Sequence, residues 1–226
     1  MKILGIDTSS NFLCVGIAED DKICEYNLEL AKQNSNILIP TIKRILEVLG
    51  WDISEIDYLA CGLGPGSFTG IRVGLSTIKG MAWALNKPII GISSLEILAR
   101  NVKIDSGFIM PIIDAKRNLV YTTIYKIKNT CIRRISPYML LDEESLLKKI
   151  KKNTILLGDG LNLYNRRKLF SSAKGIIILD KDYWYLKGFS IILSAKDKID
   201  KGELSNPFDI KPIYLYPKEC QIKINR

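Results

Sequence analysis

Short apolar runs alternate with polar turns through the first hundred residues of the chain. Strands are expected where apolar residues run together or alternate, and helices where they recur on one face. Polar turns at 8–11 and 19–22 join the first three strands, so an antiparallel meander is expected to open the fold. In chain order, the pattern predicts the elements β-β-β-α-β-α-β-α at 2–7, 12–18, 23–30, 35–49, 57–61, 69–86, 88–92 and 94–100.

The pattern partly repeats after a polar stretch at 101–107. An apolar run at 108–114 ends in an acid, as the run at 2–7 does, and Asp7 and Asp114 occupy matching positions. A duplicated β-β-β-α-β-α unit predicts an α/β fold of the actin-like class, in which two copies enclose a cleft. Two strands, a helix, two strands and a helix complete the second copy, at 119–127, 130–140, 143–150, 154–157, 174–179 and 183–199.

This repeat divides the chain into two predicted subdomains. The N-terminal subdomain is expected over 1–102, and a smaller, degenerate C-terminal subdomain over 103–205. The tail, residues 206–226, is expected to pack back on the N-terminal subdomain. With 226 residues, 47% of them hydrophobic, the chain is long enough to bury a sizeable core.

The densest glycine cluster of the chain lies at 62–74, between an expected buried strand and an expected helix. Strand, glycine loop and helix in this order are typical of a phosphate-binding loop. The cluster has no lysine where such a loop has Gly-Lys-Ser or Gly-Lys-Thr, so it does not fit a P-loop. The alternative is a loop and a helix of small residues that contact another protein.

The helix expected over 69–86, with Thr69 as its N-cap, contains three glycines. Each costs about 1 kcal/mol relative to alanine, so about 3 kcal/mol must be offset. Tight packing inside the chain would offset this cost, but we favour a partner helix, because this helix and the preceding one both carry apolar residues beyond one face. The predicted interface consists of Gly66, Ser67, Phe68, Thr69, Gly70, Arg72, Val73, Gly74, Thr77, Met81, Leu38 and Ile42.

The chain contains no histidine. This excludes a Ser-His-Asp triad, a Cys-His pair and a histidine-ligated metal within this chain. No Cys-x-x-Cys motif is present, and no apolar run approaches the roughly 18 residues of a membrane span. The protein is therefore expected in the cytoplasm, without a metal site of its own and without a membrane partner.

Basic residues are concentrated in the second half of the chain. Residues 1–100 carry 9 basic and 11 acidic side chains, a net charge of −2. The rest carries the remaining 24 of 33 basic and 13 of 24 acidic side chains, a net charge of +11. Such a charge could meet RNA phosphates, or it could form a solvated surface, which is the commoner case.

Five segments give the chain a resemblance to a known family, at 1–9, 62–74, 91–95, 114–121 and 212–215. They resemble the bacterial TsaB (YeaZ) family, and the sequence Gly-Ser-Phe-Thr-Gly at 66–70, followed by Arg72 and Gly74, is the most specific part. The likeness is strongest over residues 1–125 and loose between residues 130 and 205.

The resemblance implies an actin-like ATPase fold and a role in making N6-threonylcarbamoyladenosine beside the anticodon of tRNAs that read codons starting with A. It implies a non-catalytic subunit that scaffolds and activates a TsaD-type transferase and recruits a TsaE-type ATPase. The implied partners are these two proteins, a second copy of the chain when it is alone, and tRNA through the complex. The rival function is an enzyme that acts on its own, either an actin-like ATPase or kinase or a peptidase of the M22, glycoprotease-like class.

In active members of this superfamily, an acid after the first strand orients Mg²⁺ near the phosphates of a nucleotide. The corresponding cleft would involve Asp7, Thr8, Ser9 and Asp114. Neither turn after the two acids contains glycine, so backbone N–H groups are not free to approach phosphate oxygens closely. The nucleotide cleft is therefore expected to be degenerate: the chain alone requires no cofactor, and ATP–Mg acts only in the multi-subunit complex.

Two kinds of segment are candidates if this chain contacts tRNA. Aromatic residues at 183–185, between Lys181 and Lys187, could stack on bases, although aromatic residues at helical spacing are more often packed inside a protein. Basic runs, each equally consistent with a solvated surface, lie at 148–149, 151–152 and 166–168.

Overall fold

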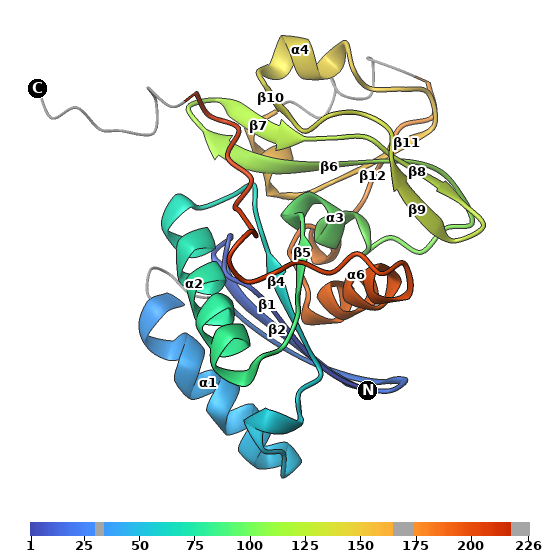
Figure 1. Ribbon diagram of the computed structural model, residues 1–226. Coiled ribbons are helices and arrows are strands. Elements are labelled where there is room, and N and C mark those ends of the chain that lie inside the picture. The colour runs from blue at the N-terminus through green and yellow to red at the C-terminus, as the bar shows by residue number, and fades with distance from the viewer. Residues whose placement is uncertain (30–33, 165–173, 218–226) are drawn as a thin grey trace, which may run out of the picture.

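The computed structural model describes residues 1–29, 34–164 and 174–217, which form two mixed β-sheets with helices packed around them (Figure 1). The first sheet has the strand order β3-β2-β1-β4-β5. Because β1 pairs antiparallel with β2 and parallel with β4, the meander expected at the start of the chain forms the centre and one edge of this sheet. Its strands are β1 (Lys2–Asp7), β2 (Phe12–Glu19), β3 (Lys22–Glu29), β4 (Tyr58–Gly62) and β5 (Ile89–Ile92).

The second sheet repeats this order as β10-β7-β6-β11-β12. Its central strand β6 is antiparallel to β7 and parallel to β11, as β1 is to β2 and β4. This correspondence confirms the predicted duplication and the α/β fold of the actin-like class. The strands are β6 (Ser106–Lys116), β7 (Leu119–Thr122), β8 (Tyr125–Lys128), β9 (Cys131–Arg134), β10 (Met139–Leu141), β11 (Thr154–Leu157) and β12 (Ile177–Ile178).

Helices cover both faces of the first sheet. Alternation along β1 explains why both faces need a cover: Leu4 and Ile6 pack on the side of α1 and α2, and Ile3 packs on the side of α6 (Figure 1). The helices are α1 (Asn34–Leu49), α2 (Phe68–Leu85), α3 (Ser94–Ala99), α4 (Glu143–Leu147) and α6 (Gly188–Asp200), with 3₁₀ turns at Ile53–Glu55, Asp159–Leu163 and Lys181–Tyr183.

Helix α6 comes from the second half of the chain but packs on the first sheet (Figure 1). The approach is close enough to require glycine, because a Cβ atom on Gly16 of β2 would collide with the carbonyl group of Gly188. The predicted subdomain 103–205 therefore includes a helix that packs outside it.

The chain returns to the first sheet once more after α6. Ser205 pairs with Ile89 of β5, and the Ile213 N–H donates a hydrogen bond of 2.8 Å to the Leu63 carbonyl. The described part of the tail thus lies on the first sheet up to this point, and residues 218–226 lie outside the described residues.

Two predicted strands are each divided in the structure. The run expected at 119–127 forms β7 and β8, and the run expected at 130–140 forms β9 and β10. The reason is the length of β6, whose 11 residues pair with β7 near one end and with β8 near the other. The helix expected over 183–199 begins only at Gly188, because the preceding 3₁₀ turn buries Trp184.

Candidate functional site

The glycine stretch at 62–74 wraps around the turn that follows β1. The Ser67 N–H donates to the Ser9 carbonyl at 2.7 Å, and the Thr8 hydroxyl donates to the Gly70 carbonyl at 2.6 Å. Four glycines, spaced four residues apart, leave room for this turn, and a Cβ atom at any of them would collide with it: Gly62 with Asp7, Gly66 with Ser9, and Gly70 and Gly74 with Thr8.

These contacts explain the glycines without a phosphate or a partner helix. The cost of glycine in α2 is offset inside the chain for Gly70 and Gly74, so the prediction that these two residues admit a partner helix is wrong. The start of α2 also differs from the prediction. Ser67 is its N-cap in place of Thr69, because the Ser67 hydroxyl oxygen accepts from the Gly70 N–H at 3.2 Å.

Asp7 lies beneath this turn and is fully buried. One carboxylate oxygen accepts from the Ser9 N–H at 2.6 Å, and the other accepts from the Ser94 hydroxyl at 2.8 Å. Burial raises the pKa of the Asp7 carboxyl, and the hydrogen bonds from Ser9 and Ser94 oppose that rise. Asp7 is therefore held by its own chain, and its position joins the β1 turn to the start of α3.

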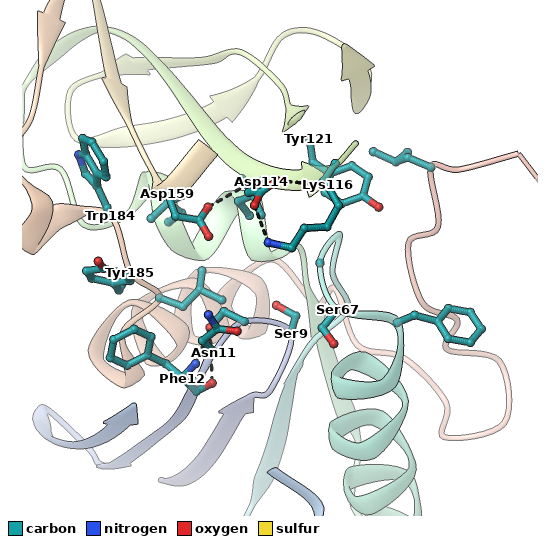
Figure 2. Close-up of a pocket in the computed structure, with 18 of the residues that line it drawn as sticks. Ser9, Asn11, Phe12, Ser67, Asp114, Lys116, Tyr121, Asp159, Trp184 and Tyr185 are labelled. Atoms are coloured by element: carbon teal, nitrogen blue, oxygen red, sulfur yellow. Dashed lines mark hydrogen bonds and ion pairs between the residues drawn. The ribbon is translucent and has the colours of Figure 1, made fainter. Parts of the chain in front are cut away.

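A cleft of about 620 Å³ lies between the two sheets. The turn after β1 lines one side through Ser9, and the glycine loop contributes Ser67 (Figure 2). The end of β6, just before its turn, lines the opposite side through Asp114 and Lys116. The duplication thus brings the two matching turns to face each other, whereas Asp7 and Thr8 are buried behind the cleft wall.

The second turn is occupied by its own polar contacts. The Lys116 ammonium pairs with Asp114 Oδ2 at 2.5 Å, and the Lys116 N–H donates to Oδ1 of the same carboxylate at 2.7 Å (Figure 2). The Asp114 N–H in turn donates to Asp159 Oδ1 at 3.0 Å. Burial raises the pKa of the Asp159 carboxyl, and the Asp114 N–H opposes this rise. The two-glycine segment at 158–160 therefore positions Asp159 against β6.

These residues do not fit a magnesium nucleotide. Asp7 does not line the cleft, and Asp114 is paired with Lys116 from its own turn. Three successive residues of that turn, Lys116, Arg117 and Asn118, have positive φ without being glycine. Within the described ranges, no group of three acidic or cysteine side chains is arranged to hold a metal ion, and no helix there combines the length and apolar character needed to cross a bilayer.

Aromatic side chains form another wall of the cleft. The Phe12 and Tyr185 rings contact each other at a tilt of 41°, with centroids 4.6 Å apart (Figure 2). Trp184 is 2% exposed, and its indole N–H donates to the Leu179 carbonyl at 2.8 Å. Packing is thus the role of Trp184 and Tyr185, and Tyr183 is the exposed member of the three.

The predicted interface residues divide into exposed and buried ones. Leu38 and Ile42 are 0% and 3% exposed, because they pack from α1 onto the first sheet, and Gly70 and Gly74 are buried against Thr8. Their prediction as contact residues is wrong for this reason. The other predicted residues are at least partly exposed, namely Gly66, Ser67, Phe68, Thr69, Arg72, Val73, Thr77 and Met81.

A different row of small residues on α2 is open to solvent. At Gly80, no atom lies within 4 Å of the position that a Cβ would occupy. Next to it, Trp83 is 71% exposed. We call this surface the α2 face, and its residues are Ser76, Gly80, Trp83 and Ala84.

Tyr214, which was not among the predicted site residues, contacts the start of α2. The Arg72 guanidinium lies 3.7 Å from the centre of the Phe68 ring, and its Nε donates to the Tyr214 hydroxyl at 3.1 Å. The Tyr214 ring lies 5.2 Å from Phe68. The segment after α6 therefore completes the surface around the N-terminus of α2, and only the resemblance at 212–215 pointed to it.

Comparisons with known proteins agree with this geometry. Residues 28–175 match the family described as TsaD: tRNA N6-adenosine threonylcarbamoyltransferase. The TsaB protein of Bacillus subtilis is 36% identical over 170 residues, 74% of each chain, and that of Buchnera aphidicola from Schizaphis graminum is 31% identical over 77% of this chain and 90% of its own. The structure of YeaZ from Pseudomonas aeruginosa covers 95% of this chain and 99% of its own with a TM-score of 0.83 at 22% identity.

The duplicated sheets and the cleft between them define an α/β protein of the actin-like class. Within this class, the likeness to YeaZ extends over nearly the whole fold. The chain belongs to the TsaB (YeaZ) family of tRNA threonylcarbamoyladenosine biosynthesis proteins.

Proposed function

We propose that this chain is a non-catalytic subunit of the cytoplasmic complex that forms threonylcarbamoyladenosine beside the anticodon of tRNAs reading codons that start with A. The observation that carries this proposal is the 36% identity to a tRNA threonylcarbamoyladenosine biosynthesis protein over three quarters of the chain. In this role the chain scaffolds and activates a TsaD-type transferase and recruits a TsaE-type ATPase. When the chain is alone, the surface that otherwise binds the transferase joins two copies of the chain.

The α2 face supports this role. It exposes 71% of the large apolar side chain of Trp83, and exposed apolar surface of this kind marks partner sites. The small residues Ser76, Gly80 and Ala84 recur every four positions along α2, so a partner helix could approach the backbone closely there.

The enzyme alternatives have less support. An actin-like ATPase or kinase needs carboxylates that face the phosphates, whereas Asp7 is buried and Asp114 is paired with Lys116. A metallopeptidase needs metal ligands, and the chain has no histidine. The chain therefore needs no cofactor of its own, and ATP–Mg acts only through the assembled complex.

Replacing Gly80 by arginine tests the partner surface. Because the site is open, Gly80→Arg should preserve the fold and gain helix propensity of about 1 kcal/mol, while a bulky cation blocks close approach on α2. We expect at least a tenfold loss of co-purification with a TsaD-type partner. Isothermal calorimetry of the purified pair gives the affinity, and circular dichroism verifies the fold.

Ile177→Arg provides the matched control. It adds the same side chain at a residue that is 53% exposed on β12, at the edge of the second sheet. This variant should co-purify as the unchanged chain does. If the Gly80 variant also retains its partner with full affinity, α2 is not the docking helix.

A further inference from the structure

The β8–β9 hairpin projects from the second sheet, and most of its cations lie on one face. Its other face packs on the core through Tyr125 and Ile127, which are 2% and 5% exposed, and Arg134, opposite Tyr125, lies 4.0 Å from the centre of the Tyr138 ring. Strand residues alternate between the faces, so Lys126 and Lys128 point outward. On β9, Arg133 lies directly opposite Lys126 and on the same face.

Two residues from neighbouring segments extend this surface. Phe108 of β6 lies opposite Lys126 on the other side of β8, and its ring is partly exposed. The Lys151 ammonium, from the loop before β11, lies 5.2 Å above the centre of that ring. We call Lys126, Lys128, Arg133 and Lys151, with Phe108 between them, the hairpin basic face.

The positive charges of this face are not neutralised by the fold. All four cations are exposed, and no acidic side chain among the described residues forms an ion pair with any of them. The nearby Lys148, by contrast, pairs with Glu144 at 2.6 Å. Like charges directly opposite each other across two strands are unfavourable. The juxtaposition of Lys126 and Arg133 therefore costs stability that an external anion would restore.

The shape and chemistry of the surface favour RNA over other anions. Cations spaced along two paired strands form an extended row, which suits the repeated charges of a phosphate backbone. The partly exposed Phe108 ring adds a flat surface on which an unstacked base can rest. The hairpin also lies far from α1 and α2 (Figure 1). A protein bound to those helices therefore leaves the hairpin basic face accessible.

We propose that the hairpin basic face binds the phosphate backbone of the tRNA that the complex modifies. This proposal rests on the proposed function for its choice of RNA, and it gives this subunit a direct contact with the substrate. It also identifies which part of the basic second half makes that contact. Of the predicted basic runs at 148–149 and 151–152, only Lys151 belongs to the hairpin basic face. The third run, residues 166–168, lies outside the described residues.

Charge reversal on the hairpin tests the proposal. The probe is a fluorescently labelled, unmodified tRNA transcript with adenosine beside the anticodon, titrated with the full chain in an anisotropy assay across a series of salt concentrations. The variant Lys126→Glu, Arg133→Glu should bind at least tenfold more weakly. It should also lower the slope of log affinity against log salt by about 2, since each lost phosphate contact removes roughly one unit.

Lys22→Glu, Lys211→Glu is the matched control, because both of its residues are exposed and it changes the net charge by the same amount. Its affinity should stay within threefold of that of the unchanged chain. Lys126→Gln, Arg133→Gln serves if the reversed variant does not fold, and it should show a smaller loss in the same direction.

Three results would overturn the proposal. The first is that the hairpin and control variants bind tRNA with equal affinity. The second is that the unchanged chain binds a duplex DNA of the same length as tightly as it binds tRNA. The third is that the unchanged chain binds no tRNA. The proposed function is judged separately, by co-purification with the transferase and by threonylcarbamoylation of tRNA. A hairpin variant that keeps its partner but loses tRNA affinity would separate the two.

Discussion

The roles of single glycines in this protein are set by a turn that lies about 55 to 66 positions away in sequence. The sequence pattern predicts a docking surface at the helical glycines Gly70 and Gly74, but Thr8 fills the space beside both. Gly80, on the same helix, has open space beside it. The chemical type is identical at the three positions, so only the neighbouring atoms distinguish an internal role from an external one.

Alanine at these positions should therefore have opposite effects on stability. Gly80→Ala should raise the free energy of unfolding by about 1 kcal/mol, the gain in helix propensity. Gly74→Ala should lower it by about 1–2 kcal/mol, because the new methyl group displaces the buried Thr8 hydroxyl from its bond to the Gly70 carbonyl. Urea denaturation of the two variants measures the difference, and equal stabilities would show that Thr8 does not require the glycine.

At the level of elements, α6 shows how the two halves are joined. Its N-cap residue Lys187 contributes no side-chain hydrogen bond. Instead, backbone N–H groups of the first turn donate hydrogen bonds to side chains of β3. The Gly188 N–H donates to Asn27 Oδ1 at 3.0 Å, and the Phe189 N–H donates to Glu25 Oε2 at 2.9 Å. An edge strand of the first sheet thus caps a helix that arrives about 160 residues later.

Removing this cap should weaken the attachment of α6. Asn27→Ala should lower the free energy of unfolding by about 1 kcal/mol, the usual value for a lost N-cap. Asn27→Asp keeps an accepting oxygen and adds negative charge at a helix N-terminus, so it should retain most of the stability. Thermal or urea unfolding compares the two, with Lys22→Ala on the same strand as the control. An alanine variant as stable as the aspartate variant would contradict the capping role.

For the whole molecule, duplication produces the cleft, but the residues in it decide its chemistry. The turns after β1 and β6 face each other across about 620 Å³, as expected for an actin-like fold. One of the two acids is buried, and the other is neutralised by a lysine two residues later. The architecture of a nucleotide cleft is thus present without the side-chain arrangement that holds Mg²⁺ and phosphates.

The lone chain should accordingly fail to bind ATP–Mg in the micromolar range. Isothermal titration of the purified chain with ATP and Mg²⁺ should give no saturable heat. The same titration with TsaD-type and TsaE-type partners present is the comparison in which binding is expected. Micromolar affinity of the chain by itself would contradict the scaffold role and favour an ATPase.

Much of the fold followed from the sequence, because local patterns are enough to specify strands, helices and their repetition. The helices expected over 35–49 and 69–86 and the matching places of Asp7 and Asp114 were predicted from spacing alone. The division of the long runs after β6 was not, since it depends on which end of β6 each strand pairs with. The boundaries of the two subdomains stay a prediction.

The sequence by itself determined the family, the duplicated architecture and the exclusion of histidine chemistry, because these depend on residue identity and order. Only the tertiary structure decided what the glycine stretch at 62–74 does. Its glycines make room for the turn that buries Asp7, whereas the exposed surface that we propose for the partner lies farther along α2, around Gly80 and Trp83. Only the paired strands of the hairpin revealed that Lys126 and Arg133 lie side by side. The physical reason is the same in both cases: a side chain's role depends on the atoms next to it, and these come from distant parts of the chain.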